Sequence, residues 1–161
     1  KILYVVANDP WQKTENTVIT EVSDRLAMVE LLLVNDDNLV ASDVEIVLGG
    51  ESVTAQTLES LQSIYPDFDL ELILGYDAAL GIESWREYER IYEFSEIVIV
   101  DRPGQLRDLP DFFDKASRIT GPYLDISSAE IRERLKNGSG IGSLLPDQVK
   151  SFILENSIYG E

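Results

Sequence analysis

Short apolar segments that alternate with amphipathic helices constrain the fold of this chain more than any other feature. In residues 21–34, Val22, Leu26, Val29 and Leu33 recur at helical spacing. Strand-like apolar segments precede and follow such helices, at residues 2–7, 39–48, 70–74, 97–100 and 123–126. This order predicts an α/β fold with a Rossmann-like parallel sheet between two layers of helices, in which ligands bind at the carboxyl ends of the strands.

The remaining elements follow from caps and turn residues. Helices are expected from residue 54 to about residue 65, in a region containing Trp85, Tyr88 and Ile91, over residues 127–138, and from residue 146. We expect the first strand, residues 2–7, to be buried and residues 8–20 to form a loop. Residues 105–121 show no clear pattern. A chain of 161 residues is expected to form a single domain over residues 1–161.

Composition excludes several classes of function. The 30 acidic and 13 basic residues give a net charge of −17, which opposes binding to nucleic acid or to an anionic membrane. The chain has no run of about 20 apolar residues, no signal peptide and no cysteine, so we expect a cytoplasmic protein. The absence of histidine excludes histidine-based acid–base and nucleophilic catalysis by these residues.

The segment at residues 126–132 is the strongest local signal for an anion site. Ser127 and Ser128 stand where a strand turns into a helix, and Arg132 follows in the first helical turns. Free N–H groups, the helix dipole and a guanidinium together suit phosphate oxygens. An ordinary capped helix with a surface arginine would look the same, because the Ser127–Glu130 capping-box spacing is common.

Other candidate residues are weaker when each is taken alone. Gly75 and Asp77 follow a strand directly, where glycine permits close approach of a ligand and aspartate can accept from ribose hydroxyls. A turn glycine with a capping aspartate is the alternative. Trp85 can stack on a planar ring or pack in the core. Lys13 and Arg102 lie in expected loops, as phosphate contacts or as solvated charges.

Taken in chain order, these segments resemble the bacterial nicotinate-nucleotide adenylyltransferase family, part of the nucleotidyltransferase superfamily. The resemblance covers nearly the whole chain, and several motifs in the right order are more specific than any one of them. The matching segments are residues 10–13 (P-x-x-K), Arg25 with Met28 (R-x-x-M), residues 54–58 (T-x-x-T-L), Gly75 and Asp77 with Trp85, residues 102–104 (R-P-G), residues 126–132 (I-S-S-x-x-I-R), and residues 145–159.

The resemblance implies an enzyme of NAD biosynthesis that transfers an adenylyl group from ATP to nicotinate mononucleotide, releasing pyrophosphate. Mg²⁺ would be held by substrate phosphates rather than by the protein. The implied ATP-binding residues are Arg132, Lys13, Ser127, Ser128, Gly75 and Asp77, with Arg132 and Lys13 acting in catalysis. The implied residues for nicotinate mononucleotide are Trp85, Thr54 and Arg102. The resemblance leaves open whether the chain forms a homo-oligomer.

The sequence also departs from the family pattern. The family opens with a strand, a histidine-bearing H-x-G-H phosphate loop and a helix, and this segment is not among residues 1–161. We expect the natural protein to begin about one strand–loop–helix unit earlier, and residues 1–161 alone to be inactive. Val53, Leu48 and Ala129 replace the tyrosine, arginine and threonine that the family usually has at or near these positions, so some substrate contacts are in doubt.

Two other functions remain open at this stage. A catalytically inactive nucleotide-binding or interaction protein would also fit a chain that lacks the histidine motif. Phosphopantetheine adenylyltransferase has a similar S-S-x-x-R segment, although the spacing to Trp85, the R-P-G loop and the segment around Tyr159 favour the nicotinate enzyme. The upstream sequence, with or without H-x-G-H, would separate the enzyme from the binding protein.

Overall fold

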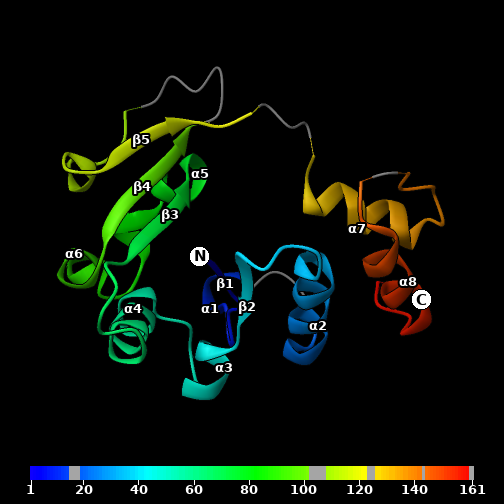
Figure 1. The fold of residues 1–161 in the computed structure, drawn as a ribbon. Coiled ribbons are helices and arrows are strands. Elements are labelled where there is room, and N and C mark those ends of the chain that lie inside the picture. The colour runs from blue at the N-terminus through cyan, green and yellow to red at the C-terminus, as the bar shows by residue number, and fades with distance from the viewer. Residues whose placement is uncertain (15–18, 102–107, 123–125, 143, 160–161) are drawn as a thin grey trace. The chain divides into compact units, whose positions relative to one another are not determined.

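The computed structural model describes residues 1–14, 19–101, 108–122, 126–142 and 144–159 (Figure 1). The chain forms two compact units, which are described separately: unit 1 comprises residues 1–51 and 125–161, and unit 2 comprises residues 52–124. Both contain parallel strands joined by helices, as the sequence predicts. No helix in the described ranges is long and apolar enough to span a bilayer. The expectation of a single domain stays a prediction.

Unit 1 contains a parallel pair of strands and five helices among its described residues. Ile2 lies opposite Leu39 and Val5 opposite Ser42 in the parallel pair β1–β2. Helix α2 contacts both β2 and α8, and Leu33 of α2 is buried. The elements are β1 (Ile2–Val5), α1 (Trp11–Thr14), α2 (Val22–Leu33), β2 (Leu39–Ser42), α3 (Val44–Leu48), α7 (Ser128–Lys136) and α8 (Asp147–Glu155).

Unit 2 is built on a three-stranded parallel sheet in the order β3-β4-β5. Because the strands are parallel, their last residues, Gly75, Asp101 and Thr120, lie along one edge of the sheet. The elements are α4 (Thr54–Ile64), β3 (Glu71–Gly75), α5 (Tyr76–Leu80), α6 (Ile91–Phe94), β4 (Glu96–Asp101), β5 (Ser117–Thr120) and three 3₁₀ turns, Ile82–Ser84, Tyr88–Arg90 and Asp111–Phe113. The buried core consists of Ala55, Leu58, Leu74, Ala79, Ile82, Ile91, Ile97, Ile99 and Phe113.

The helix expected around Trp85 is broken into short turns. Glu87 adopts a left-handed backbone conformation with φ of 57°, which an α-helix cannot contain. Its carboxylate accepts hydrogen bonds from Arg90 (2.6 Å) and from Gln56 of α4 (2.7 Å), and these bonds lower the pKa of Glu87. Tertiary contacts with α4 therefore stabilise a conformation that the periodicity of the segment does not indicate.

The strand expected over residues 39–48 is correct only in its first half. β2 ends at Ser42, and residues 44–48 form helix α3, in which the Val47 amide donates to the Asp43 carbonyl. Val44 is buried, whereas Val47 is 77% exposed. Apolar alternation over five residues cannot distinguish a strand from a helix. Here the segment forms a helix that buries Val44 and leaves Val47 exposed.

Three further expectations need correction. The first strand is expected to be buried, but Ile2 and Tyr4 of β1 are 44% and 41% exposed to solvent among the described residues. The final strand is not at residues 123–126: residues 123–125 lie outside the described ranges, and Ile126 belongs to no strand. Strand β5 lies instead within residues 105–121, where its exposed Ser-Arg-Ile-Thr sequence lacked an alternating pattern.

Candidate functional site

The amino-terminal end of α7 has the geometry of an anion site. Ser127 is the N-cap residue, and its Oγ accepts a hydrogen bond from the Glu130 amide at 3.1 Å. This confirms half of the predicted capping box, since the Glu130 carboxylate accepts instead from Arg134 at 2.6 Å. The cap accounts for one of the first N–H groups of the helix. The preceding amides lack intrahelical partners, as in any helix, and can bind an anion.

Arg132 supplies a positive charge on the same helix. Ser128 and Arg132 are four residues apart and therefore share one face of α7. Both serines are exposed and Arg132 is half-buried. Arg132 forms no ion pair with another described residue, in contrast to Arg134, which pairs with Glu130. The structure thus brings Ser127, Ser128 and Arg132 together as the sequence predicts.

Lys13 lies in the short helix α1 rather than in a loop. The helix begins directly after Pro10, and the Trp11 amide donates to the Asp9 carbonyl at 2.9 Å. Proline fixes its own φ and favours such a start, and a helix of four residues is too short for an apolar period to indicate it. Lys13 therefore belongs to a helical turn in unit 1, between β1 and α2.

In unit 2, Gly75 and Asp77 lie at the carboxyl edge of the sheet. Gly75 is the last residue of β3, and Asp77 is an exposed residue in the first turn of α5. The Gly75 backbone is extended (φ −69°), and a Cβ at this position would meet no atom within 4 Å. Neither backbone conformation nor packing requires glycine here. A close approach by a ligand is a physical reason that remains.

A bidentate ion pair stands at the same edge. Arg118 of β5 donates to Asp101 of β4 through Nε (2.9 Å) and through a terminal nitrogen (2.7 Å). These hydrogen bonds hold the pKa of Asp101 below its usual value, because they favour the carboxylate. Sequence reasoning missed this pair, since neither residue belongs to a motif. Arg102, which follows Asp101, lies outside the described residues.

Thr54 is the first residue of α4, as predicted. The N-cap residue, Val53, is extended and supplies no side-chain hydrogen bond to the helix. Ala55 and Leu58 on the same helix are buried in the core of unit 2, which fixes the helix in place. The half-buried Thr54 therefore begins an amide cluster on a rigid element, where a carboxylate would be favoured.

Trp85 has an environment that fits both of its proposed roles. Its backbone is extended after the 3₁₀ turn Ile82–Ser84, and its amide donates to the Ile82 carbonyl at 2.8 Å. The side chain packs against the core of unit 2 but remains partly exposed. Part of the indole thus contributes to the core, and part is accessible for stacking.

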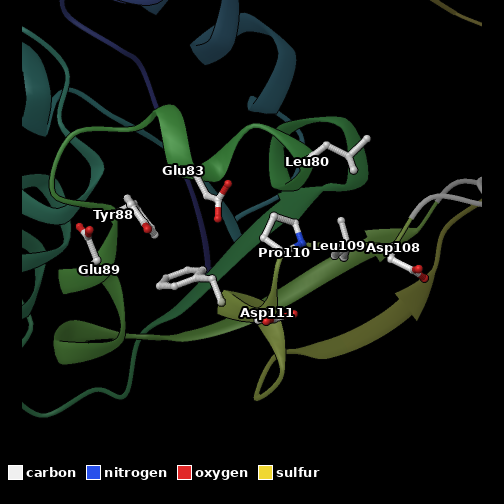
Figure 2. Close-up of a pocket in the computed structure, with 9 residues that line it drawn as sticks. Leu80, Glu83, Tyr88, Glu89, Asp108, Leu109, Pro110 and Asp111 are labelled. Carbon is white, nitrogen blue, oxygen red and sulfur yellow. The ribbon is translucent and has the colours of Figure 1, made fainter.

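A hollow of about 600 Å³ in unit 2 is not formed by these residues (Figure 2). Four carboxylates contribute to its lining, and Glu83 points into the space between Tyr88 and Pro110. The pKa of Tyr88 is raised mainly by burial and, to a smaller extent, by the negative charges of Glu89 and Glu83. The negative surroundings disfavour phosphates, and Gly75, Asp77, Thr54 and Trp85 do not line the hollow.

The sequence of this chain is similar to a known family and to curated proteins that cover most of its length. Residues 1–134 match the Cytidylyltransferase-like family. A probable nicotinate-nucleotide adenylyltransferase from Corynebacterium glutamicum is 33% identical, over 98% of this chain and 74% of the relative. A protein of the same description from Citrifermentans bemidjiense is 34% identical, over 99% of this chain and 84% of the relative.

Solved structures confirm the fold. Plasmodium falciparum nicotinic acid mononucleotide adenylyltransferase complexed with NaAD matches with a TM-score of 0.76 at 20% identity, over 99% of this chain and 82% of that chain. The same enzyme complexed with APC matches with a TM-score of 0.73 at 20% identity, with the same coverage. The predicted α/β nucleotidyltransferase fold with parallel strands is therefore correct. The family match and the sequence identity over almost the full chain show that this protein belongs to the nicotinate-nucleotide adenylyltransferase family.

Proposed function

We propose that this protein transfers the adenylyl group of ATP to nicotinate mononucleotide, forming nicotinate adenine dinucleotide and pyrophosphate. Relatives above 30% identity over nearly the whole chain carry the name of this reaction. The observation that carries the proposal is the amino-terminal end of α7, where two exposed serines and an arginine with no ion-pair partner among the described residues share one helix. This arrangement suits the phosphates of ATP.

The reaction needs alignment and charge neutralisation more than acid–base catalysis. An oxygen of the mononucleotide 5′-phosphate attacks the α-phosphorus of ATP, and the bond from that phosphorus to the oxygen bridging to the β-phosphate breaks. The electron pair of that bond leaves on pyrophosphate. Negative charge grows on the leaving oxygen, so cations and backbone amides that meet it lower the barrier.

On the ATP side, Arg132 would neutralise charge on the phosphates, and the Ser127 and Ser128 hydroxyls would donate to phosphate oxygens. The Oγ of Ser127 accepts from Glu130, which leaves its own proton to donate. Lys13 would add a second charge from α1. Gly75 and Asp77 would meet the adenosine ribose, a role supported by the open space above Gly75.

On the nicotinate side, the exposed part of Trp85 would stack on the pyridine ring. The first amides of α4, beginning at Thr54, would meet the carboxylate of the ring, since the amino-terminal end of a helix favours an anion. Arg102 would lie near the mononucleotide as a further cation. This assignment makes the charge on the ring the feature that the protein selects.

Mg²⁺ would reach the site on the phosphates of ATP. Within the described ranges, no group of three or more carboxylate, histidine or cysteine side chains is placed to hold a metal ion. We assign no residue to the ion, because the family resemblance implies that it binds through the substrate phosphates. When bound, it would neutralise phosphate charge, in addition to the side chains and amides named above.

A pyrophosphate-release assay with the full-length protein, ATP, Mg²⁺ and nicotinate mononucleotide tests the function. Arg132→Ala is expected to lower kcat/KM for ATP by about two to three orders of magnitude, as the loss of other charged contacts to a transition state does. Lys136→Ala, an exposed charge one turn further along α7, is the matched control and should change little.

The same assay separates the alternatives. Turnover with phosphopantetheine instead of nicotinate mononucleotide would support the phosphopantetheine enzyme. Binding of ATP without turnover of any acceptor would support the nucleotide-binding protein. Near-normal turnover by Arg132→Ala at limiting ATP would show that α7 does not hold the phosphates.

A further inference from the structure

The loop that carries α1 is held at both ends by a single side chain. Arg25 lies in the first turns of α2, and its guanidinium donates to three backbone carbonyls: Nε to Thr20 at 2.9 Å, one terminal nitrogen to Asn8 at 2.9 Å and the other to Ala7. Ala7 and Asn8 precede α1, and Thr20 follows it. The two ends of the loop are therefore joined through one planar group.

The chemistry of arginine suits this role. A guanidinium has a rigid fork of donors, so it can bind carbonyls that approach from different directions, whereas an ammonium presents a single centre. Ala7, Asn8 and Thr20 lie outside β1 and α2, where no ladder or helix supplies a donor to their carbonyls. Arg25 is half-buried and satisfies these groups, which would otherwise destabilise the loop.

A second set of contacts fixes the same end of the loop. The Asn8 side chain donates to the Gly50 carbonyl at 2.8 Å, and Asp9 forms a parallel bridge with Glu51. The carbonyl of Asn8 is thus held by Arg25 and its side chain by Gly50. Helix α1 begins directly afterwards, with the Trp11 amide bonded to the Asp9 carbonyl.

We propose that Arg25 is a positioning residue for the reaction, because its three carbonyl contacts hold Ala7 and Asn8, just before α1, together with Thr20, and the proposed function assigns Lys13 of α1 to the phosphates of ATP. The inference rests on the proposed function, and specifically on the role of Lys13 in it. Arg25 acts through the backbone and touches no reacting atom. A displacement of about 1 Å in such a group can lower a rate by about 100-fold.

Steady-state kinetics of the full-length protein test the inference. Arg25→Met keeps the apolar stem but removes every donor, and it is expected to lower kcat/KM for ATP at least about tenfold while KM for nicotinate mononucleotide stays unchanged. Arg25→Lys should restore only part of the loss, since one ammonium cannot serve both ends of the loop. Arg134→Met, which breaks an exposed pair on α7, is the matched control.

A double-mutant cycle with Lys13→Ala separates positioning from folding. If Arg25 acts through Lys13, adding Arg25→Met to Lys13→Ala should cost little more than Lys13→Ala alone. Faster amide hydrogen exchange at residues 7–14, with an unchanged thermal midpoint, is expected for Arg25→Met. Additive effects, equal losses for both substrates, or unchanged kinetics in Arg25→Met would overturn the inference. No effect of Lys13→Ala would instead refute the proposed role of Lys13 itself.

Discussion

Ser127 serves α7 and, in the proposed function, also ATP, and one substitution can separate the two roles. Aspartate is as good an N-cap residue as serine, and its charge is favoured by the helix dipole. The carboxylate introduced by Ser127→Asp would therefore accept from the Glu130 amide, as the Oγ of Ser127 does at 3.1 Å. We expect the stability of the helix to be unchanged within about 0.5 kcal/mol.

Binding of ATP should respond very differently. A carboxylate at the cap would stand within about 5 Å of a phosphate held by the amides that precede Glu130 in the first turn. At an effective dielectric constant of about 20, two unit charges at that distance repel each other by about 3 kcal/mol, which corresponds to a loss of more than about 100-fold in affinity. Ser127→Ala should instead lose about 1 kcal/mol of stability from the missing cap, with a smaller loss in ATP binding.

Thermal unfolding and kcat/KM for ATP, measured on both variants, give the comparison. Ser151→Asp adds the same charge at an exposed position on α8 and controls for net charge. The expected pattern is a stable but nearly inactive Ser127→Asp. If Ser127→Asp keeps near-normal efficiency with ATP, the phosphates do not lie at this end of α7.

Two further predictions concern unit 2. Full-length protein should prefer nicotinate mononucleotide over its ring amide by more than about tenfold in kcat/KM, or more than about 1.4 kcal/mol. Trp85→Leu, which retains apolar bulk, should lower kcat/KM for the mononucleotide more than kcat/KM for ATP. Equal efficiency with the acid and the amide would reject the assignment of Thr54 and Trp85. Arg118 lowers the pKa of Asp101 in the folded protein. The pair therefore stabilises the fold fully at pH values above about 3.9, the pKa of an unfolded aspartate. This stabilisation is lost as the pH falls through the lower pKa of folded Asp101. The difference in urea midpoint between wild type and Asp101→Asn should therefore be full at neutral pH and disappear in acid, and a pH-independent difference would contradict this explanation.

Much of the secondary structure is determined locally by the sequence. Helices α2, α4 and α8 follow from apolar spacing, because a long amphipathic segment has few other ways to bury its apolar face, whereas α7 follows from its Ser127 cap. Strands β3 and β4 follow from continuous apolar runs, which are typical of a parallel sheet. Ser127, Ser128 and Arg132 lie close together because they belong to one helix and its cap, so local structure alone determines their spacing.

Short segments were decided by tertiary contacts instead. Residues 44–48 alternate like a strand and form a helix, and the region after Trp85 has helical spacing but is interrupted at Glu87. In both cases the local preference is small, and contacts with other elements outweigh it. The Glu87 carboxylate, for example, is held by Gln56 of α4, a residue far away in the sequence.

The sequence by itself determined the class of fold, the capped helix over residues 128–136 and the family resemblance. Only the tertiary structure showed that Arg25 joins the carbonyls of Ala7, Asn8 and Thr20, and that Arg118 pairs with Asp101. A motif records residue types and their spacing, and it marks Arg25 without indicating what that residue touches. Which carbonyls or carboxylates a guanidinium meets depends on how separate segments pack, and that is fixed by the free energy of the whole fold rather than by any local pattern.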